Sequence, residues 1–379
     1  MAGFAGCAST SSTDDTPAGQ SGGANGATDA GSATLEFGTD GEILSSPTVV
    51  DGTVYVGSAD NRLYAVDATT GDEQWRFGTD GTVYSSPQVV DGTVYVGSGL
   101  GQDPGDTRLY AVDAATGTEQ WQFETGNRVK ASPTVAGETV YVTSRDGNLY
   151  AINAASGEQQ WAFDIGYTAE SSPAVVDGTV YAGSFDNNLY AVDAESGTER
   201  WRFETGDLVR SSPTVASGTV YVGSSDDTLY ALDAATGDLA WEFATEDSEF
   251  GVQSSPTVHN GMVFVGAYDT TLYAVDAEAG TAEWGVATDD VVVSSPTVVG
   301  GTVYVGSQDG NLYAVDRETG DERWSLSTGG SVFSSPTVAS GTVYVGSDDT
   351  TLYGVALDGN GSSEGSRIRH RTLGHHGSE

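Results

Sequence analysis

A tripeptide ending in proline recurs eight times along this chain. Seven copies read Ser-Ser-Pro and one reads Ala-Ser-Pro, and successive prolines are 40, 46, 40, 40, 43, 40 and 40 residues apart. The prolines are Pro47, Pro87, Pro133, Pro173, Pro213, Pro256, Pro296 and Pro336. A fixed period near 40 residues indicates a repeat architecture in which each repeat is one supersecondary unit.

Each repeat contains the pattern of a four-stranded antiparallel meander. In the first repeat, apolar residues alternate with small or polar ones on both sides of Asp51-Gly52. Asp-Gly between two such runs predicts a hairpin, because a type I′ turn requires a positive φ at both central residues. The other repeats fill this slot with Asp91-Gly92, Asp177-Gly178, Asn260-Gly261, Gly300-Gly301 and the Ser-Gly pairs at 217 and 340. The predicted strands of the first repeat are 48–50, 53–57, 63–66 and 75–77.

Four-stranded units of this length are typical of propeller blades. One blade cannot bury both of its faces, whereas a closed ring of blades buries them and leaves only short edges. The sequence therefore predicts an all-β fold, an eight-bladed β-propeller of four-stranded antiparallel blades. We expect it to form one domain over residues 33–358.

The tryptophans predict how this ring closes. All seven occupy the fourth strand of a repeat: Trp75, Trp121, Trp161, Trp201, Trp241, Trp284 and Trp324. The eighth repeat has no fourth strand, but Leu35-Glu36-Phe37 and the Gly-Thr-Asp-Gly after it match the sequence that begins at Trp75. We expect this N-terminal strand to complete the last blade as a velcro closure, with Leu35 in the place of a tryptophan.

The run AVDATTGDEQW from Ala65 to Trp75 recurs with small changes in six further repeats, beginning at Ala111, Ala151, Ala191, Ala231, Ala274 and Ala314. It resembles the tryptophan-docking motif of the PQQ-like (pyrroloquinoline-quinone) repeat propellers. That superfamily includes quinoprotein alcohol dehydrogenases and BamB, the lipoprotein of the outer-membrane β-barrel assembly machine. The resemblance covers roughly residues 34–357. It implies that each tryptophan stacks against the neighbouring blade, where it removes about 150–250 Å² from water.

The resemblance predicts the fold and not an activity. Quinoprotein dehydrogenases of this superfamily carry a vicinal cysteine pair, a Ca²⁺ cluster and a catalytic Asp. This chain has a single cysteine, Cys7, and no Asp, Glu and Asn grouping stands out from the repeats. We therefore predict that the protein is not an enzyme and has no catalytic residues, no cofactor and no metal site.

The charge of the chain is strongly negative. It contains 54 acidic and 14 basic residues, and its single lysine is Lys130. Abundant Asp and Glu with almost no lysine resembles proteins of salt-in halophiles, haloarchaea above all; the alternative is an ordinary acidic secreted protein. Either composition disfavours nucleic acid as a partner, because no basic face exists to release counterions.

The two ends of the chain differ from the repeats. Residues 1–7 resemble a truncated signal segment with a lipobox, in which Cys7 would be lipidated, and residues 8–32 predict a disordered acidic Gly/Ser/Thr linker. Residues 359–379 predict a disordered tail; it contains His370, His375 and His376, which we do not expect to bind metal. We expect an extracytoplasmic, lipid-anchored monomer at the cell surface that meets the membrane only through Cys7.

One face of the predicted ring varies more than the other. Both departures from a 40-residue period fall on the face that carries the second-to-third turns and the blade-to-blade loops: six extra residues between Ser98 and Leu109, and three after Trp241. Eight turn aspartates lie there too: Asp60, Asp106, Asp146, Asp186, Asp226, Asp269, Asp309 and Asp349. They could collect cations, but we expect them to bond their own turns. Loop variation indicates binding, so this is the candidate face.

The position three residues before each proline varies strongly, although the Ser-Ser-Pro motif that follows it is nearly constant. It reads Leu44, Tyr84, Lys130, Glu170, Arg210, Gln253, Val293 and Phe333, with Arg128 two residues before the lysine on the predicted strand face. Four contiguous blades (7, 8, 1 and 2) present apolar or aromatic residues, and the other four present polar ones. We predict a binding rim with an apolar and a polar arc; the alternative is solvent-exposed positions of random content.

Three functions fit this pattern. The first is a non-catalytic, BamB-like scaffold for protein–protein interaction, with a protein partner that the sequence does not identify. The second is a quinoprotein-type oxidoreductase, and the third is a propeller that binds a small ligand or cation. The one propeller histidine, His259, lies in a turn opposite the candidate face. We favour the scaffold.

The net charge of −40 predicts that stability depends on salt. Dilution from about 1 M to about 0.1 M salt lengthens electrostatic screening from about 3 Å to about 10 Å, so repulsion among the surface carboxylates increases. We expect the thermal unfolding midpoint to fall steadily over this range, as followed by circular dichroism. A constant midpoint would show that the acidic surface is not an adaptation to salt.

Overall fold

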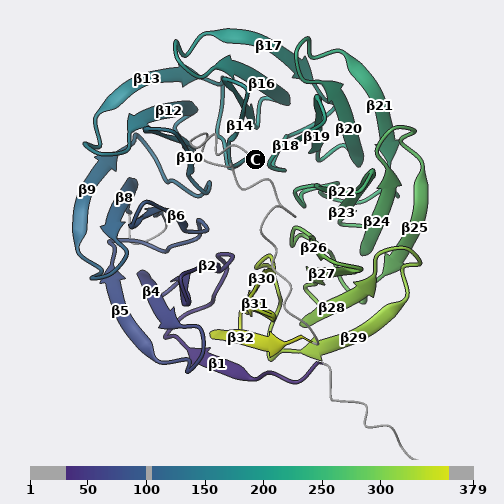
Figure 1. Cartoon of the computed structure of the whole chain (residues 1–379). Helices are drawn as coiled ribbons and strands as arrows, with labels where there is room; N and C mark the ends of the chain where they lie inside the picture. Colours follow the sequence, from purple (N-terminus) through teal and green to yellow (C-terminus); the bar gives the residue numbers. More distant parts are fainter. Residues whose placement is uncertain (1–30, 100–104, 358–379) are drawn as a thin grey trace, which may run out of the picture.

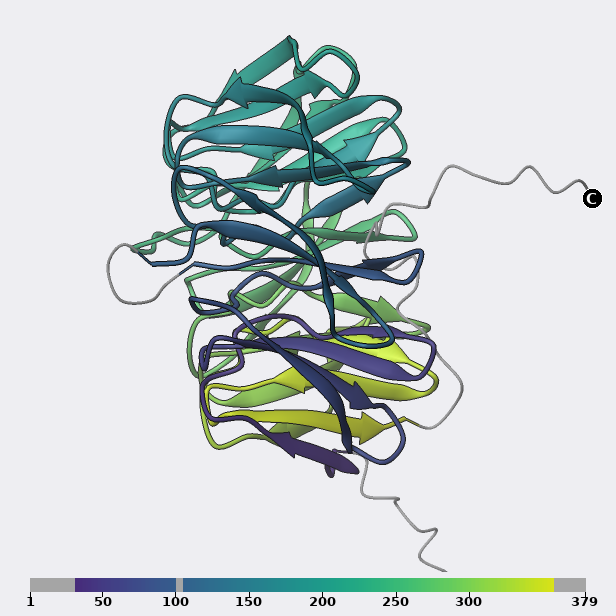
Figure 2. The same ribbon diagram turned by 90° about the vertical axis from the view of Figure 1, so that its left-hand side faces the viewer.

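The computed structural model describes residues 31–99 and 105–357. These residues form eight four-stranded antiparallel sheets, arranged as a ring (Figure 1). Residues of all eight sheets or of the loops that enter them line a central cavity, which we call the channel. Figure 2 shows the same ring edge-on. The predicted all-β, eight-bladed propeller is confirmed. We number the blades 1 to 8 in chain order, beginning with the sheet β2-β3-β4-β5.

The first strand of each blade lies at the channel and the second lies behind it (Figure 1). The innermost strands are β2 (Thr48–Val50), β6 (Gln88–Val90), β10 (Thr134–Ala136), β14 (Ala174–Val176), β18 (Thr214–Ala216), β22 (Thr257–His259), β26 (Thr297–Val299) and β30 (Thr337–Ala339). The second strands are β3 (Thr53–Ser58), β7 (Thr93–Gly97), β11 (Thr139–Thr143), β15 (Thr179–Gly183), β19 (Thr219–Gly223), β23 (Met262–Gly266), β27 (Thr302–Gly306) and β31 (Thr342–Gly346).

The third strands and the outermost strands have six residues each, except β1, which has four. The third strands are β4 (Arg62–Asp67), β8 (Arg108–Asp113), β12 (Asn148–Asn153), β16 (Asn188–Asp193), β20 (Thr228–Asp233), β24 (Thr271–Asp276), β28 (Asn311–Asp316) and β32 (Thr351–Ala356). The outer strands are β5 (Glu73–Gly78), β9 (Glu119–Glu124), β13 (Gln159–Asp164), β17 (Glu199–Glu204), β21 (Leu239–Ala244), β25 (Ala282–Ala287), β29 (Glu322–Ser327) and, for blade 8, β1 (Leu35–Gly38).

The turns between first and second strands have the predicted geometry in most blades. Asp51 and Gly52 have φ values of 48° and 76°, so both central residues are in the left-handed region that a type I′ turn requires. The Gly300-Gly301 turn is different. Only Gly300 has a positive φ, of 59°, which is the type II′ pattern. The type I′ prediction was therefore wrong for blade 7, because two glycines permit either geometry.

The N-terminal strand completes blade 8, as predicted. β1 pairs antiparallel with β32, with Leu35 opposite Gly354 and Gly38 opposite Thr351. The Thr34 N–H donates to the Gly354 carbonyl at 2.7 Å, and the Leu35 side chain is 8% exposed. Segments from the two ends of the described chain thus share one sheet, and the ring has no open seam (Figure 1).

Each tryptophan lies at the seam to the next blade. The Trp75 indole N–H donates to the Ala114 carbonyl of blade 2 at 2.9 Å. A Cβ at Gly117 of that blade would lie 2.7 Å from the Trp75 ring, so only glycine fits there. The same indole-to-carbonyl bond is made by Trp121, Trp161, Trp201, Trp241 and Trp284. The repeated glycine of the motif thus leaves room for the ring of the preceding tryptophan.

The hydrophobic core is divided among the seams. One cluster joins Tyr55, Leu63 and Ala65 of blade 1 to Val94 and Tyr110 of blade 2, and all five side chains are buried. Seven further clusters of the same kind occur in the described chain. Each blade is therefore stabilised by its neighbours, which makes the closure of the ring a condition for its stability.

Removal of β1 tests the closure. We expect deletion of residues 1–38 to lower the unfolding midpoint sharply, because it exposes the edge of β32 and leaves Leu35's place in the core empty. Deletion of residues 1–30, which retains β1, should have little effect. A Leu35→Ala substitution should cost about 2–5 kcal/mol, the range for a buried leucine. Equal melting of the two deletions would contradict the closure.

Candidate functional site

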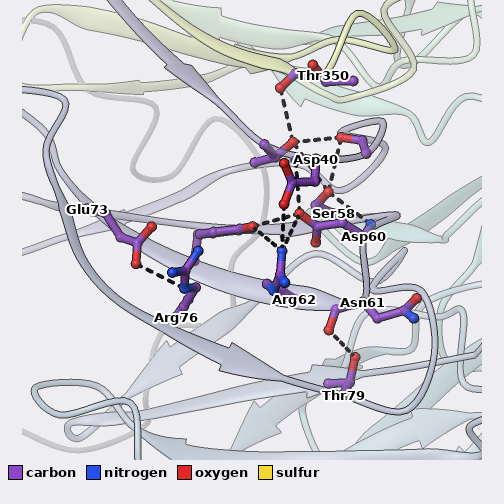
Figure 3. A network of polar contacts seen from close by, with 12 residues as sticks. Asp40, Ser58, Asp60, Asn61, Arg62, Glu73, Arg76, Thr79 and Thr350 are labelled. Carbon is purple, nitrogen blue, oxygen red and sulfur yellow. Dashed lines mark hydrogen bonds and ion pairs between the residues drawn. The ribbon is translucent and has the colours of Figure 1, made fainter.

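The turn aspartates hold the loops of the candidate face. Asp60 Oδ2 accepts hydrogen bonds from the Tyr64 hydroxyl at 2.6 Å and from the Asp40 N–H at 3.1 Å. Figure 3 shows Arg62 between Asp40 and Asp60 in this network. The tyrosine four residues on makes the same bond in the other blades, to Asp106, Asp146, Asp186, Asp226, Asp269, Asp309 and Asp349. In every blade but blade 4, the same carboxylate also accepts from a backbone N–H of the loop that enters the blade, and so connects the turn to that loop.

This connection also establishes which loops share a face. Asp40 belongs to the loop from β1 to β2, and Asp60 belongs to the turn from β3 to β4. The second-to-third turns and the blade-to-blade loops thus lie on one side of the ring, as predicted (Figure 2). Among the described residues, no three His, Cys, Asp or Glu side chains lie close enough to share a metal ion.

The central channel is closed around its circumference by serines. The second serine of each Ser-Ser-Pro donates its N–H to the hydroxyl oxygen of the same serine in the next blade, and Ser335 of blade 8 donates to Ser46 of blade 1 at 2.9 Å. The other members are Ser86, Ser132, Ser172, Ser212, Ser255 and Ser295. These serines line a cavity of about 550 Å³ together with the prolines and threonines beside them. We call this set the serine ring.

The eight predicted rim residues lie two residues before the serines of the serine ring, in the loops that enter the innermost strands on the candidate face, and we call this side of the ring its mouth. All eight are partly buried: Leu44, Tyr84, Lys130, Glu170, Arg210, Gln253, Val293 and Phe333. We call this set the rim. The structure does not present them as freely solvated side chains; whether they bind a partner stays a prediction.

Glu170 of blade 4 lies among three cations. Its carboxylate oxygens are 3.3 Å from Lys130 Nζ, 3.2 Å from Arg145 Nε and 3.7 Å from an Arg210 guanidinium nitrogen. The Glu170 side chain is 17% exposed, so solvent reaches it. The cluster contains three positive charges and one negative charge in a protein whose net charge is −40. We call these four residues the Glu170 cluster.

Aromatic rings flank the cations of this cluster. Lys130 Nζ lies 5.1 Å from the centroid of the Tyr84 ring, and the Arg210 guanidinium lies 4.4 Å from that of Phe185. Both distances are within the range of a cation–π interaction. Arg210 Nε is buried and has no hydrogen-bond partner among the described residues. The rings position the cations without using their hydrogen-bond donors.

Sequence reasoning missed a second variable ring. Arg145 and Phe185 precede the turn aspartates, and each contacts a rim residue of the following blade. The equivalent residues are Ala59, Gly99, Arg145, Phe185, Ser225, Tyr268, Gln308 and Asp348, and the N–H of each pairs with the loop that enters its own blade. The signal was present in the sequence, because this position varies beside a constant aspartate.

The extended loop after Trp241 also contributes to this face. Phe250 packs edge-on against Tyr268, with ring centroids 5.1 Å apart, and Phe250 remains 39% exposed. The Ser248 hydroxyl donates to Asp227 Oδ1 at 2.6 Å, which fixes the loop. Of the other extension, between Ser98 and Leu109, residues 100–104 lie outside the described residues.

Two predictions about the rim need correction. Arg128 is not on a strand: it lies in the loop before β10, where its carbonyl accepts from the Arg145 N–H at 3.0 Å. The apolar arc is also not purely apolar. The second ring places Asp348 of blade 8 there, and Glu42, just before Leu44, interacts with it electrostatically. The sequence of a single repeat does not reveal these contacts, because Arg145, Asp348 and Glu42 belong to other turns and loops than the rim residues.

Asp348 is in an unfavourable environment for a charge. Its Oδ1 is buried without a hydrogen-bond partner among the described residues. Burial, followed by repulsion from Glu42 and Asp349, raises the pKa of Asp348 from 3.8 to about 6. Blades 8 and 4 lie opposite each other in the ring (Figure 1), so the rim has an acidic side that faces the Glu170 cluster.

His259 lies at the end of β22, next to the first-to-second turn on the opposite face. Burial, and secondarily the charge of Arg317, lowers its pKa. Cys7, with the predicted tail histidines His370, His375 and His376, lies outside the described residues. Those predictions stay open.

Two family profiles match the sequence. One, described as the β-propeller of the β-alanine-activating enzyme, matches residues 170–366. The other, described as outer membrane protein assembly factor BamB, matches residues 21–162 and 79–202. This chain belongs to the PQQ-like repeat propellers. No curated protein matches the sequence significantly.

Solved structures share the fold of this PQQ-like propeller at low sequence identity. BamB from Moraxella catarrhalis is 19% identical, with a TM-score of 0.72 over 86% of this chain and 98% of that one. A europium-containing methanol dehydrogenase is 15% identical, with a TM-score of 0.74 over 86% and 93%. The computationally designed Ika8 protein is 17% identical, with a TM-score of 0.75 over 86% and 100%. These likenesses concern the fold alone.

Residues 31–99 and 105–357 contain no helix that is long and apolar enough to cross a bilayer.

The raised pKa of Asp348 predicts a pH-dependent stability. The pKa of Asp348 is about 6 in the folded protein and 3.8 ordinarily. The free energy of unfolding therefore falls as the pH rises from about 4 to 6, because the charged carboxylate is less stable in the folded state. Above pH 6 this destabilisation is complete. We expect Asp348→Asn to stabilise the propeller by on the order of 1 kcal/mol at pH 8, allowing for solvent screening. The gain should shrink as pH falls towards 4. Thermal melts from pH 8 to pH 5 check this, and a gain independent of pH would contradict it.

Proposed function

We propose that this PQQ-like propeller is a non-catalytic scaffold that binds an extended segment of a partner protein at its rim. One observation carries the proposal: the rim and the second ring vary from blade to blade, whereas the serine ring beneath them is constant. If the rim and the second ring served only the fold, their residues would be expected to repeat from blade to blade as the serines do. Variation confined to the mouth of a channel is typical of a binding surface on a rigid scaffold.

The apolar arc supports binding of a protein segment. Val293, Phe333 and Leu44 come from blades 7, 8 and 1, which are contiguous, and all three are partly exposed at the mouth. Apolar patches bordered by polar groups usually mark interaction sites, because water contact with such a patch is unfavourable until a partner covers it. The exposed Phe250, in the loop that enters blade 6, adds an aromatic side chain on the blade next to Val293.

We further propose that the protein works outside the cytoplasm, attached to the membrane by a lipid at Cys7, in an organism that lives in high salt. The family resemblance to BamB supports the first part, and the net charge of −40 with one lysine supports the last. Lipid attachment would limit the search for partners to proteins at the same membrane. Labelling with a radioactive fatty acid or prenyl precursor in cells, with Cys7→Ser as control, would test the anchor.

A quinoprotein-type oxidoreductase is the second candidate, because the fold is shared with a methanol dehydrogenase. The single cysteine of the chain cannot form the vicinal pair of those enzymes. Titration with pyrroloquinoline quinone and Ca²⁺, followed by absorbance, separates the two candidates. Saturable binding with alcohol-dependent reduction of the quinone would favour the oxidoreductase.

Substitution of the apolar arc tests the scaffold. We expect a Leu44→Asp, Phe333→Asp double variant to fold, because both side chains are already partly exposed, and to lose its partner in capture from solubilised membranes at high salt. Loss of two apolar contacts and the added charge should reduce capture at least tenfold, or about 1.4 kcal/mol. The matched control is Leu239→Asp, an exposed leucine on an outer strand. Capture of the same proteins by the double variant and the parent would exclude the apolar arc.

A further inference from the structure

We infer that blades 3 to 5 form a binding subsite for a carboxylate, and that Glu170 occupies this subsite until a carboxylate of a partner segment replaces it. This inference rests on the proposed scaffold function and specifies the chemistry of the partner. The partner segment would bear an Asp or Glu side chain, or a chain terminus, beside an apolar residue.

The charge balance of the Glu170 cluster supports a second carboxylate. Lys130, Arg145 and Arg210 surround one internal carboxylate, so these four residues together carry a net charge of +2. Asp146, next to Arg145, directs one carboxylate oxygen to a tyrosine hydroxyl and a loop N–H instead of to these cations. In a chain that is acidic almost everywhere else, this is the surface most complementary to an acidic segment.

The contacts within the cluster are loose for charged groups. The three distances to Glu170, 3.2 to 3.7 Å, exceed the 2.7 to 2.9 Å that is usual for charge-assisted hydrogen bonds. Arg210 Nε is buried and has no hydrogen-bond partner among the described residues. One carboxylate cannot satisfy three cations, two from blade 3 and one from blade 5. An incoming carboxylate would therefore find hydrogen-bond donors that are not yet used.

The aromatic rings keep the cations in place during such an exchange. Arg210 lies on Phe185 and Lys130 lies on Tyr84, and neither contact depends on Glu170. Displacement of Glu170 would leave both cations in contact with their aromatic rings. Arginine binds a carboxylate through two parallel hydrogen bonds, which gives the subsite its preference.

Peptide binding to the full chain tests this inference. The probe is a rhodamine-labelled, amidated peptide Gly-Phe-Glu-Glu-Phe-Gly, and its matched control replaces both Glu residues by Gln. Fluorescence anisotropy is measured at the lowest KCl concentration at which every variant melts like the parent. The parent should bind the Glu peptide more tightly than the Gln peptide, and added KCl should reduce the difference.

The variants distinguish the subsite from general charge attraction. Glu170→Gln, which keeps the side-chain shape, should bind the Glu peptide about threefold to tenfold more tightly, because it removes the competing carboxylate. Arg210→Gln should weaken binding of the Glu peptide about tenfold and leave the Gln peptide unchanged. Arg323→Gln, which breaks an ion pair with Asp316 between strands of blade 7, serves as the control and should bind like the parent.

Several outcomes would overturn the inference. Equal binding of the two peptides to the parent would exclude a carboxylate preference. Unchanged or weaker binding of the Glu peptide by Glu170→Gln would show that Glu170 does not occupy the subsite. Equal or tighter binding of free citrate would assign the cluster to small polycarboxylates. If Glu170→Gln does not fold, the selective loss in Arg210→Gln decides the matter. Membrane capture by the apolar-arc variant tests the scaffold independently, so either proposal can fail alone.

Discussion

The serine ring is the interaction on which the rest of the structure depends. Each blade receives one N–H at its innermost point and donates one to the next blade, and the bond from Ser335 to Ser46 joins the end of the propeller to its beginning. In blade 1 the first serine of the tripeptide acts within its own blade, where Ser45 exchanges two hydrogen bonds with Gly57. In blades 5 and 6 it bonds to the next blade, because Ser211 donates to the Ser254 carbonyl and Ser254 donates to the Ser294 carbonyl. The second serine joins every blade to its neighbour, which explains why it is the same in all eight repeats, whereas the first is alanine in blade 3.

Most of the fold could be predicted from the sequence because its signals are local and repeated. Asp51-Gly52 specifies a hairpin by its own φ values, and the match between Leu35 and Trp75 indicated that β1 completes the last blade. The tryptophan seam was expected from the family motif, and the structure adds its reason: Gly117 leaves room for the Trp75 ring. The predicted type I′ turn was wrong at Gly300-Gly301, because two glycines permit both the type I′ and the type II′ geometry.

The candidate site was predictable only in part, because its contacts join repeats. The rim position was identified from its variability, but its partners were not. Arg145 reaches Glu170 and Phe185 supports Arg210 because turns of one blade lie beside the entering loop of the next. That neighbourhood exists only in the closed ring. The second ring could have been found by the same test of variability, applied to the residue before each turn aspartate.

The two sides of the mouth carry opposite charge, which would orient a segment that binds across it. Asp348 of blade 8 and Glu42 beside it lie opposite the Glu170 cluster of blades 3 to 5, and Leu44 and Phe333 lie on the acidic side. A segment across the mouth would place its carboxylate at Arg210 and its apolar or cationic part towards Asp348. The raised pKa of Asp348 makes the acidic side the more readily neutralised of the two. Orientation of the partner would therefore come from the Glu170 cluster, and apolar contact from the opposite arc would add affinity.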